Sequence, residues 1–362
     1  MKIKKIRLKL ILISMLPIAL IIREYLSHNP LAVENLYSRL IYPPIGKGLS
    51  ILTGIFSFSI AELLLYIAFC AIFYFILRFI FRVFTSANKL HEIIKGAVNA
   101  LCIFSIAYCL FLLLWGFNYY RQPLAYSLGY KIEESSTADL KELCAVLINK
   151  TNQLRAKTTE NQSGLMYIAG GFDSIIQRSS IGYKNISQYY PDLGGYYGNP
   201  KAVIASRALC YTGIAGIYFP FTAEANFNKL VPDPMLPATL CHEMAHQRGF
   251  AREDEANFIA YLTCKAHTDS DFQYSGYFLA LIYSMNSLYK YDIEAYNELV
   301  TGYSPGVAKD LKYQSEFWKQ FEGPANDMQE KLNDAYLKSN KQADGVYSYG
   351  RMVDLLLAEY RK

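Results

Sequence analysis

The chain opens with apolar stretches separated by polar and basic segments. Residues 96–117 carry no charged side chain, and residues 63–77 are uncharged and rich in Leu, Ile, Tyr and Phe. Apolar stretches of this kind predict helices that cross a bilayer rather than helices buried in a globular core. We place two transmembrane helices at about residues 60–80 and 96–117.

A shorter apolar stretch at about residues 10–22 comes first. Its length would suit the core of a signal peptide, but Arg23 and Glu24 follow it where small residues are needed for cleavage. We therefore predict an uncleaved first span. Residues 1–117 then form a membrane anchor of three transmembrane helices.

Basic residues predict the orientation of this anchor. They gather in the N-terminal leader and in the short loop between the second and third spans, and these loops belong in the cytoplasm by the positive-inside rule. Residues 118–362 are then extracytoplasmic, and the lipid bilayer is the expected partner. The net charge of +5 is too small to indicate nucleic-acid binding. The basic residues are Lys2, Lys4, Lys5, Arg7 and Lys9 in the leader, and Arg78, Arg82, Lys89 and Lys95 in the loop.

Beyond residue 117 the pattern changes to shorter amphipathic segments. A Ser-Ser-Thr run followed by apolar residues at helical spacing predicts a helix over 138–155. Residues 157–200 are rich in Gly, Ser, Asn and Tyr and predict a loop, whereas residues 203–221 are apolar and predict an extended stretch. We expect residues 118–362 to form a mostly helical α+β domain with a small sheet, so that the whole chain is mainly α.

The segment CHEMAHQRGFAREDEANFIAYL, which begins at Cys241, contains the motif HExxH. On a helix, His242 and His246 lie on one face, where two imidazoles can bind one Zn²⁺. Glu243 lies beside them and can deprotonate a water on the metal, so it is the predicted general base. Gly249 predicts the end of this helix. The motif indicates a zinc metallopeptidase, and its polar surroundings argue against an intramembrane protease.

A catalytic zinc site usually takes a third protein ligand. The spacing resembles that of the metzincins up to the glycine, but Arg252 occupies the position of their third histidine. The run EDEANFIAYL is similar to the glutamate-ligand zincins (gluzincins), in which a downstream helix carries Glu followed by Ala and Asn or Asp. This resemblance implies Glu255 as the third ligand and Asn257 as support for the site. The short connection after the histidines leaves Glu253 and Asp254 as alternatives.

Other residues are candidates for roles near the site. His267 lies about 18 Å beyond Glu255 along a continuous helix, so both cannot reach one metal, and we expect His267 at a helix end or on the surface. Tyr349 and Arg351 precede the last helix and could donate hydrogen bonds to an oxyanion, although packing and a surface salt bridge compete as an interpretation. Glu224 is expected to cap a helix or to pair with a cation.

Four cysteines lie in the expected outer domain: Cys144, Cys210, Cys241 and Cys264. Four cysteines allow three disulfide pairings, and the sequence does not choose between these pairings or exclude free thiols. Cysteines in the apolar spans are expected to act as apolar filler.

The three apolar stretches, the motif segment, the preceding GIYFPFTAEANFN and the terminal GVYSYGRMVDLLL together resemble a family of bacterial membrane proteins. That family is known as a domain of unknown function and is regarded as zincin-like. The likeness extends over nearly the entire chain. It implies a location in the bacterial membrane and supports zinc as the cofactor, but it supplies no substrate.

We therefore expect a membrane-anchored zinc metallopeptidase whose substrate is a peptide or protein outside the cytoplasmic membrane. The apolar stretch before the motif is the expected edge strand for binding this substrate by main-chain pairing. Two alternatives remain open: a non-catalytic zinc-binding sensor or scaffold of the cell envelope, and a zinc amidase that acts on cell-wall peptide.

Overall fold

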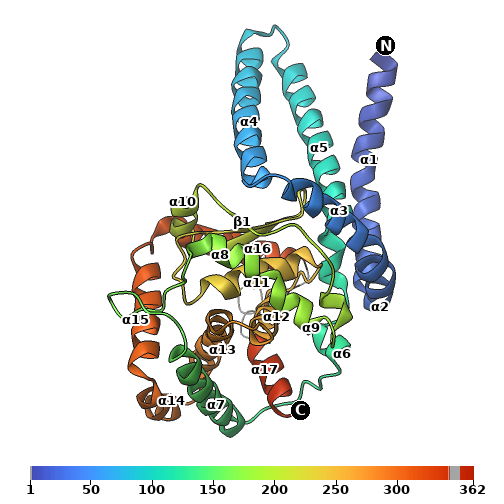
Figure 1. Cartoon of the computed structure of the whole chain (residues 1–362). Coiled ribbons are helices and arrows are strands. Elements are labelled where there is room, and N and C mark those ends of the chain that lie inside the picture. The colour runs from blue at the N-terminus through green and yellow to red at the C-terminus, as the bar shows by residue number, and fades with distance from the viewer. Residues whose placement is uncertain (1, 341, 343–350) are drawn as a thin grey trace.

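The computed structural model describes residues 2–340, 342 and 351–362, and it shows a globular body from which long helices project (Figure 1). In the described part of the chain, two helices are long and apolar enough to cross a membrane, which is consistent with membrane anchoring. They are α4 (Ile60–Thr85) and α5 (Lys89–Leu114). Most of their apolar side chains are exposed, unlike those of a helix buried in a globular core.

The first predicted span lies within α1 (Lys2–Ser27), which packs along α5. The hydroxyl of Ser105 on α5 donates to the carbonyl oxygen of Leu12 at 2.5 Å, and the ammonium of Lys9 donates to the Asn99 side chain at 2.6 Å. Charged residues toward both ends of α1 restrict its apolar run. This helix is not among those long and apolar enough to cross a membrane.

The predicted third span ends earlier than expected. Helix α5 stops at Leu114, and Trp115 and Phe117 are buried in the globular body instead of continuing the span. They pack with a segment that connects α1 to α4 and comprises α2 (Pro30–Ala32), a π-helix η1 (Val33–Ile41) and α3 (Tyr42–Gly54). This segment shares a buried cluster with Trp115, Phe117, Tyr218 and Ala251, so the expected domain boundary at residue 117 does not separate two packing units.

The globular body is mainly helical. Ser136 and Asp139 form a reciprocal capping box at the start of α7, which confirms the predicted helix over 138–155. The helical elements of the body are η2 (Gly116–Tyr120), α6 (Leu124–Leu128), α7 (Thr137–Arg155), α8 (Gly171–Arg178), α9 (Ser180–Ile186), η3 (Pro191–Leu193), α10 (Ser206–Tyr211), α11 (Leu236–Gln247), α12 (Glu253–Lys265), α13 (Ser270–Tyr291), α14 (Ile293–Leu299), η4 (Val300–Gly302), α15 (Pro305–Lys319), α16 (Pro324–Ser339) and α17 (Met352–Tyr360).

A small sheet lies on the side of the body that faces α4 (Figure 1). Within the described residues it has the strand order β1-β3-β2, with β1 (Lys201–Ala202) parallel and β2 (Gly216–Phe219) antiparallel to β3 (Glu224–Phe227). Strand β2 is therefore an edge strand among the described residues, and the Tyr218 amide hydrogen-bonds the carboxylate of Glu243. The predicted extended stretch at 203–221 contains β2 but also the short helix α10.

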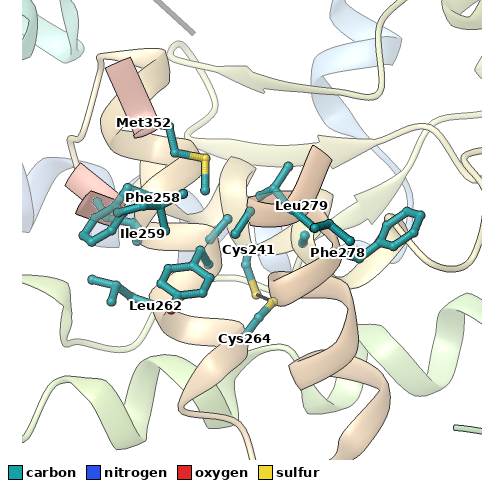
Figure 2. Packing of buried hydrophobic residues seen from close by; sticks show 14 of the residues in the cluster. Cys241, Phe258, Ile259, Leu262, Cys264, Phe278, Leu279 and Met352 are labelled. Atoms are coloured by element: carbon teal, nitrogen blue, oxygen red, sulfur yellow. Dashed lines mark hydrogen bonds between the residues drawn. The ribbon is translucent and has the colours of Figure 1, made fainter. Parts of the chain in front are cut away.

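Helices α11, α12 and α13 pack against one another and form the centre of the core. Figure 2 shows Cys241 of α11 and Cys264 of α12 inside this core, surrounded by Phe258, Leu279 and other apolar side chains. The two sulfur atoms are 3.7 Å apart. The structure thus brings together one of the six pairs that the four cysteines beyond residue 117 could form.

Candidate metal centre

Helix α11 places the two histidines of the motif on one face. Their imidazole rings are perpendicular, with centroids 4.7 Å apart, and the Nε2 atoms of His242 and His246 are 3.0 Å from each other. Such close approach of two Nε2 atoms requires a proton or a cation between them, since two lone pairs repel.

A tight turn brings α12 back toward the histidines. Gly249 adopts φ +85°, and the amide of Phe250 donates to the carbonyl oxygen of Ala245, so that α11 ends in a left-handed glycine cap as predicted. Helix α12 then begins at Glu253. Its Oε2 atom lies 3.2 Å from the Nε2 atom of His242 and 3.6 Å from that of His246.

The carboxylate next to the histidines is therefore that of Glu253. Glu255, which we expected as the third ligand, is not in this cluster. Residues two apart on a helix point in nearly opposite directions. The Oε1 atom of Glu255 instead accepts hydrogen bonds from the Leu124 amide at 2.7 Å and from Arg252 at 3.1 Å. Asp254, the other alternative, also lies outside the His-His-Glu cluster.

The histidine tautomers are determined by oxygen atoms behind the rings. The Nδ1 atom of His246 donates to the carbonyl oxygen of Phe250 at 2.7 Å, and the Nδ1 atom of His242 donates to the Oδ1 atom of Asn257 at 2.8 Å. The Asn257 amide is itself oriented, because its Nδ2 atom donates to the Tyr283 hydroxyl at 3.1 Å. In the neutral imidazoles, both Nε2 atoms therefore present lone pairs to the same point.

The spacing of the three donor atoms fits a zinc ion. Bonds of about 2.05 Å arranged tetrahedrally place two ligand atoms about 3.3 Å apart. The separations of 3.0, 3.2 and 3.6 Å among His242, His246 and Glu253 bracket this value. Two imidazoles and one carboxylate are also a donor set that catalytic zinc takes, with a fourth position left for water.

Glu243 lies beside the cluster and is buried. Burial raises the pKa of its carboxyl group to about 7, although the neighbouring imidazoles favour the charged form. Its Oε2 atom has no hydrogen-bond partner among the described residues. A Cβ atom at Gly216 of β2 would come within 2.5 Å of its Oε1 atom, so the glycine makes room for the carboxylate.

The end of α11 is bonded to the segment that follows α5 and to the segment that precedes α4. The indole nitrogen of Trp115 donates to the carbonyl oxygen of His246 at 3.2 Å. The hydroxyl of Tyr42 donates to the carbonyl oxygen of Gln247 at 2.9 Å and lies 3.0 Å from the Tyr218 hydroxyl. Tyr42 thus satisfies a carbonyl group at the helix C-terminus, and Trp115 adds a second hydrogen bond to the His246 carbonyl, which also accepts from the Gly249 amide at 2.8 Å.

A cleft of about 1650 Å³ opens over the cluster. Helices α11 and α12 and strand β2 line it on one side, and α13, α15 and α16 contribute most of the rest. The lining includes ten Phe, Tyr and Trp residues: Phe111, Trp115, Tyr119, Tyr218, Phe219, Tyr283, Tyr296, Tyr303, Trp318 and Tyr336.

Tyr336 of α16 is a cleft residue that the sequence reasoning missed. Its hydroxyl accepts a hydrogen bond from the Tyr119 hydroxyl at 3.0 Å. Burial and the charge of Glu253 raise its pKa to about 12, so the phenol stays protonated at neutral pH. Tyr336 is far from the motif in sequence, and no local pattern indicated this proximity.

Neither Arg351 nor His267 belongs to the His-His-Glu cluster. Tyr349 lies outside the described residues, and Arg351 is exposed at the start of α17 and is not among the residues that line the cleft. His267 follows α12 as expected for a helix end, but it is buried, donates to the carbonyl oxygen of Arg178 at 3.1 Å and stacks on Phe272.

Glu224 has the structural role that the sequence predicted. Its carboxylate caps the N-terminus of α4 by accepting from the amides of Ile60 at 3.0 Å and Ala61 at 2.6 Å. It also forms a buried ion pair with Lys201.

The fold and the site together define a mainly helical protein with a His-His-Glu cluster in an aromatic cleft next to apolar helices. The chain belongs to the family described as "Protein of unknown function (DUF3810)", whose model matches residues 37–357. No curated protein and no solved structure matches the chain.

Proposed function

We propose that this protein is a membrane-anchored zinc metallopeptidase. The observation that carries the proposal is the convergence of His242 Nε2, His246 Nε2 and Glu253 Oε2 within 3.6 Å of one another, next to a buried Glu243 carboxylate oxygen with no partner among the described residues. A purely structural zinc site would not need this additional carboxylate.

His242, His246 and Glu253 would hold the ion. A bound zinc ion lowers the pKa of water and polarises a carbonyl group. Glu243 then orients the attacking water, accepts its proton and passes that proton to the leaving nitrogen.

The edge of β2 provides the backbone groups for binding an extended peptide beside the cluster. Antiparallel addition of a substrate strand would continue the sheet and place its carbonyl groups along the cleft. Tyr336 is positioned to donate a hydrogen bond to the oxyanion that forms at the scissile carbonyl, since it lines the cleft and stays protonated. In this proposal it replaces Tyr349 and Arg351.

The orientation of the chain supports an outward-facing site. The beginning of α1 and the turn between α4 and α5 lie at one end of the molecule, and the globular body lies at the other (Figure 1). The basic residues of the leader and of the α4–α5 region gather toward the first end, which the positive-inside rule assigns to the cytoplasm. The cleft would then face the extracytoplasmic side.

Metal analysis and hydrolysis by the full chain, purified in detergent, test the proposal. The wild-type protein should hold one zinc ion per chain and hydrolyse peptides from a mixed-sequence library. Glu243→Gln should retain zinc and lose hydrolysis, and His246→Ala should lose both. A wild-type protein without stoichiometric zinc would overturn the proposal, and full hydrolysis by Glu243→Gln would overturn its mechanism. Zinc with no hydrolysis of any amide substrate would favour a sensor or scaffold instead.

A further inference from the structure

The metal centre is attached to the end of α5 without a linker. Helix α5 ends at Leu114, and the next residue, Trp115, donates to His246 and packs edge-on against its imidazole with ring centroids 5.9 Å apart. Phe111, in the last turn of α5, contacts the Trp115 ring at 6.3 Å and lines the same cleft. With a rise of about 1.5 Å per residue, Phe111 lies within about 5 Å of the helix end.

The peptide-binding sheet is attached in the same way to the start of α4. Glu224 of β3 caps the amides of Ile60 and Ala61, and the carboxylate of Glu62 on α4 accepts from the amides of Ile204 at 2.8 Å and Ala205 at 2.8 Å. Strand β3 pairs with β2 along the full length of both strands. The two carboxylates in these contacts, those of Glu224 and Glu62, are buried. The edge strand and helix α11 therefore have fixed positions relative to the ends of α4 and α5.

Aromatic side chains connect the end of α5 to the edge strand. The ring of Trp115 lies 5.3 Å from that of Tyr218 on β2, and the ring of Phe111 lies 6.5 Å from that of Tyr336. Phe111 and Trp115 both line the cleft, so the cleft reaches the end of α5, where the surface of the bilayer would lie.

We propose that the substrate is a polypeptide tethered to the same membrane and cut close to its anchor, an inference that rests on the proposed peptidase function. A rigidly mounted site next to the bilayer meets a tethered chain at a high effective concentration. Peptide bonds far from the anchor reach this site only when the substrate segment between them and the anchor folds back toward the membrane. The tether is an acyl chain or a transmembrane helix, because both hold the adjoining residues of the substrate close to the membrane surface.

Proteoliposomes containing the full chain and zinc test this inference with one mixed-sequence peptide library prepared in three forms. The first form is palmitoylated directly at one end, with the N-terminus and the C-terminus used in separate sets. The second carries a flexible Gly/Ser spacer of about 30 residues between the acyl chain and the mixed segment. The third is acetylated and has no anchor. The Glu243→Gln variant in identical vesicles measures background cleavage.

The directly tethered library should be cleaved at least about tenfold faster than the acetylated one, since tethering raises the local concentration. Cuts should cluster within about ten residues of the anchor, a distance of about 33 Å in an extended chain. The spacer form is equally concentrated on the vesicle but should be cut more slowly. Equal rates for all three forms, with cleavage that depends on Glu243, would overturn this inference and leave the peptidase function intact. Cleavage of none of them by a protein that lacks zinc would overturn both.

Discussion

The indole nitrogen of Trp115 donates a 3.2 Å hydrogen bond to the backbone carbonyl oxygen of His246, and the two rings meet edge-to-face. A residue that follows an apolar helix thus caps the helix that carries His242 and His246. Trp115→Phe should keep the ring contact but remove one hydrogen bond from the carbonyl, which still accepts from the Gly249 amide at 2.8 Å, and it should lower the free energy of unfolding by about 0.5–1 kcal/mol. Thermal unfolding of the detergent-solubilised chain measures this loss. An unchanged midpoint would show that water replaces the indole.

The two glutamates at the start of α12 should behave differently. Glu253→Gln removes the carboxylate charge next to both imidazoles and should weaken zinc binding by more than about 100-fold, since ligand loss exceeds the effect of supporting residues. Glu255→Gln is the matched control, because the amide oxygen can still accept from Leu124, and its affinity should stay within about threefold of wild type. Competition with a chromophoric chelator gives both values, and the reverse ranking would restore Glu255 as the ligand.

Asn257 should act on zinc affinity through His242. Asn257→Ala removes the acceptor that holds Nδ1 of His242, and the affinity should fall by about 10- to 100-fold. Asn257→Asp keeps an acceptor at this position and should recover most of the loss. If both variants bind zinc as the wild type does, the hydrogen bond does not orient the ligand.

Zinc affinity should rise with pH. Burial lowers the pKa of His246, but the carboxylate of Glu253 has the larger combined effect and raises it to about 9 in the metal-free protein. Zinc must displace this proton, so below pH 9 the affinity should increase by about tenfold per pH unit for one released proton. Chelator competition at pH 6, 7 and 8 tests the slope, and calorimetry in buffers of different ionisation enthalpy counts the protons. A flat profile would contradict the assignment.

The Cys241–Cys264 pair should close into a disulfide under mild oxidation. Thiol–disulfide exchange with a small disulfide oxidant removes one hydrogen from each thiol and links α11 to α12, and a loop of this length gives about 3 kcal/mol of stabilisation. Peptide mapping without reduction identifies the cross-link. Cys144→Ser should still form it and Cys264→Ser should not. Persistent free thiols at both positions after partial unfolding and refolding in the oxidant would rule it out.

Much of the local structure followed from the sequence. The apolar composition of α4 and α5, the capping box of α7 and the glycine that ends α11 all depend on a few neighbouring residues. Helical spacing alone placed His242 and His246 on one face and made Glu243 their neighbour. These features are short-range, so periodicity and capping chemistry are sufficient to predict them.

The same reasoning also gives some information on which carboxylate joins the two histidines. Glu253 and Asn257 are four residues apart and share a face of α12, whereas Glu255 and Asn257 do not. An asparagine that supports a histidine therefore already favoured Glu253. The resemblance to the gluzincins implied Glu255 instead.

The sequence by itself determined which side chains share a face within one helix and which stretches are apolar enough to cross a membrane. Only the tertiary structure decided which faces meet. The contacts of Trp115, Tyr42 and Tyr336 with the cleft join segments that are far apart in the chain, and their pairing depends on how whole helices pack. Local propensity carries no information about such packing, because the same amphipathic pattern is compatible with many partners.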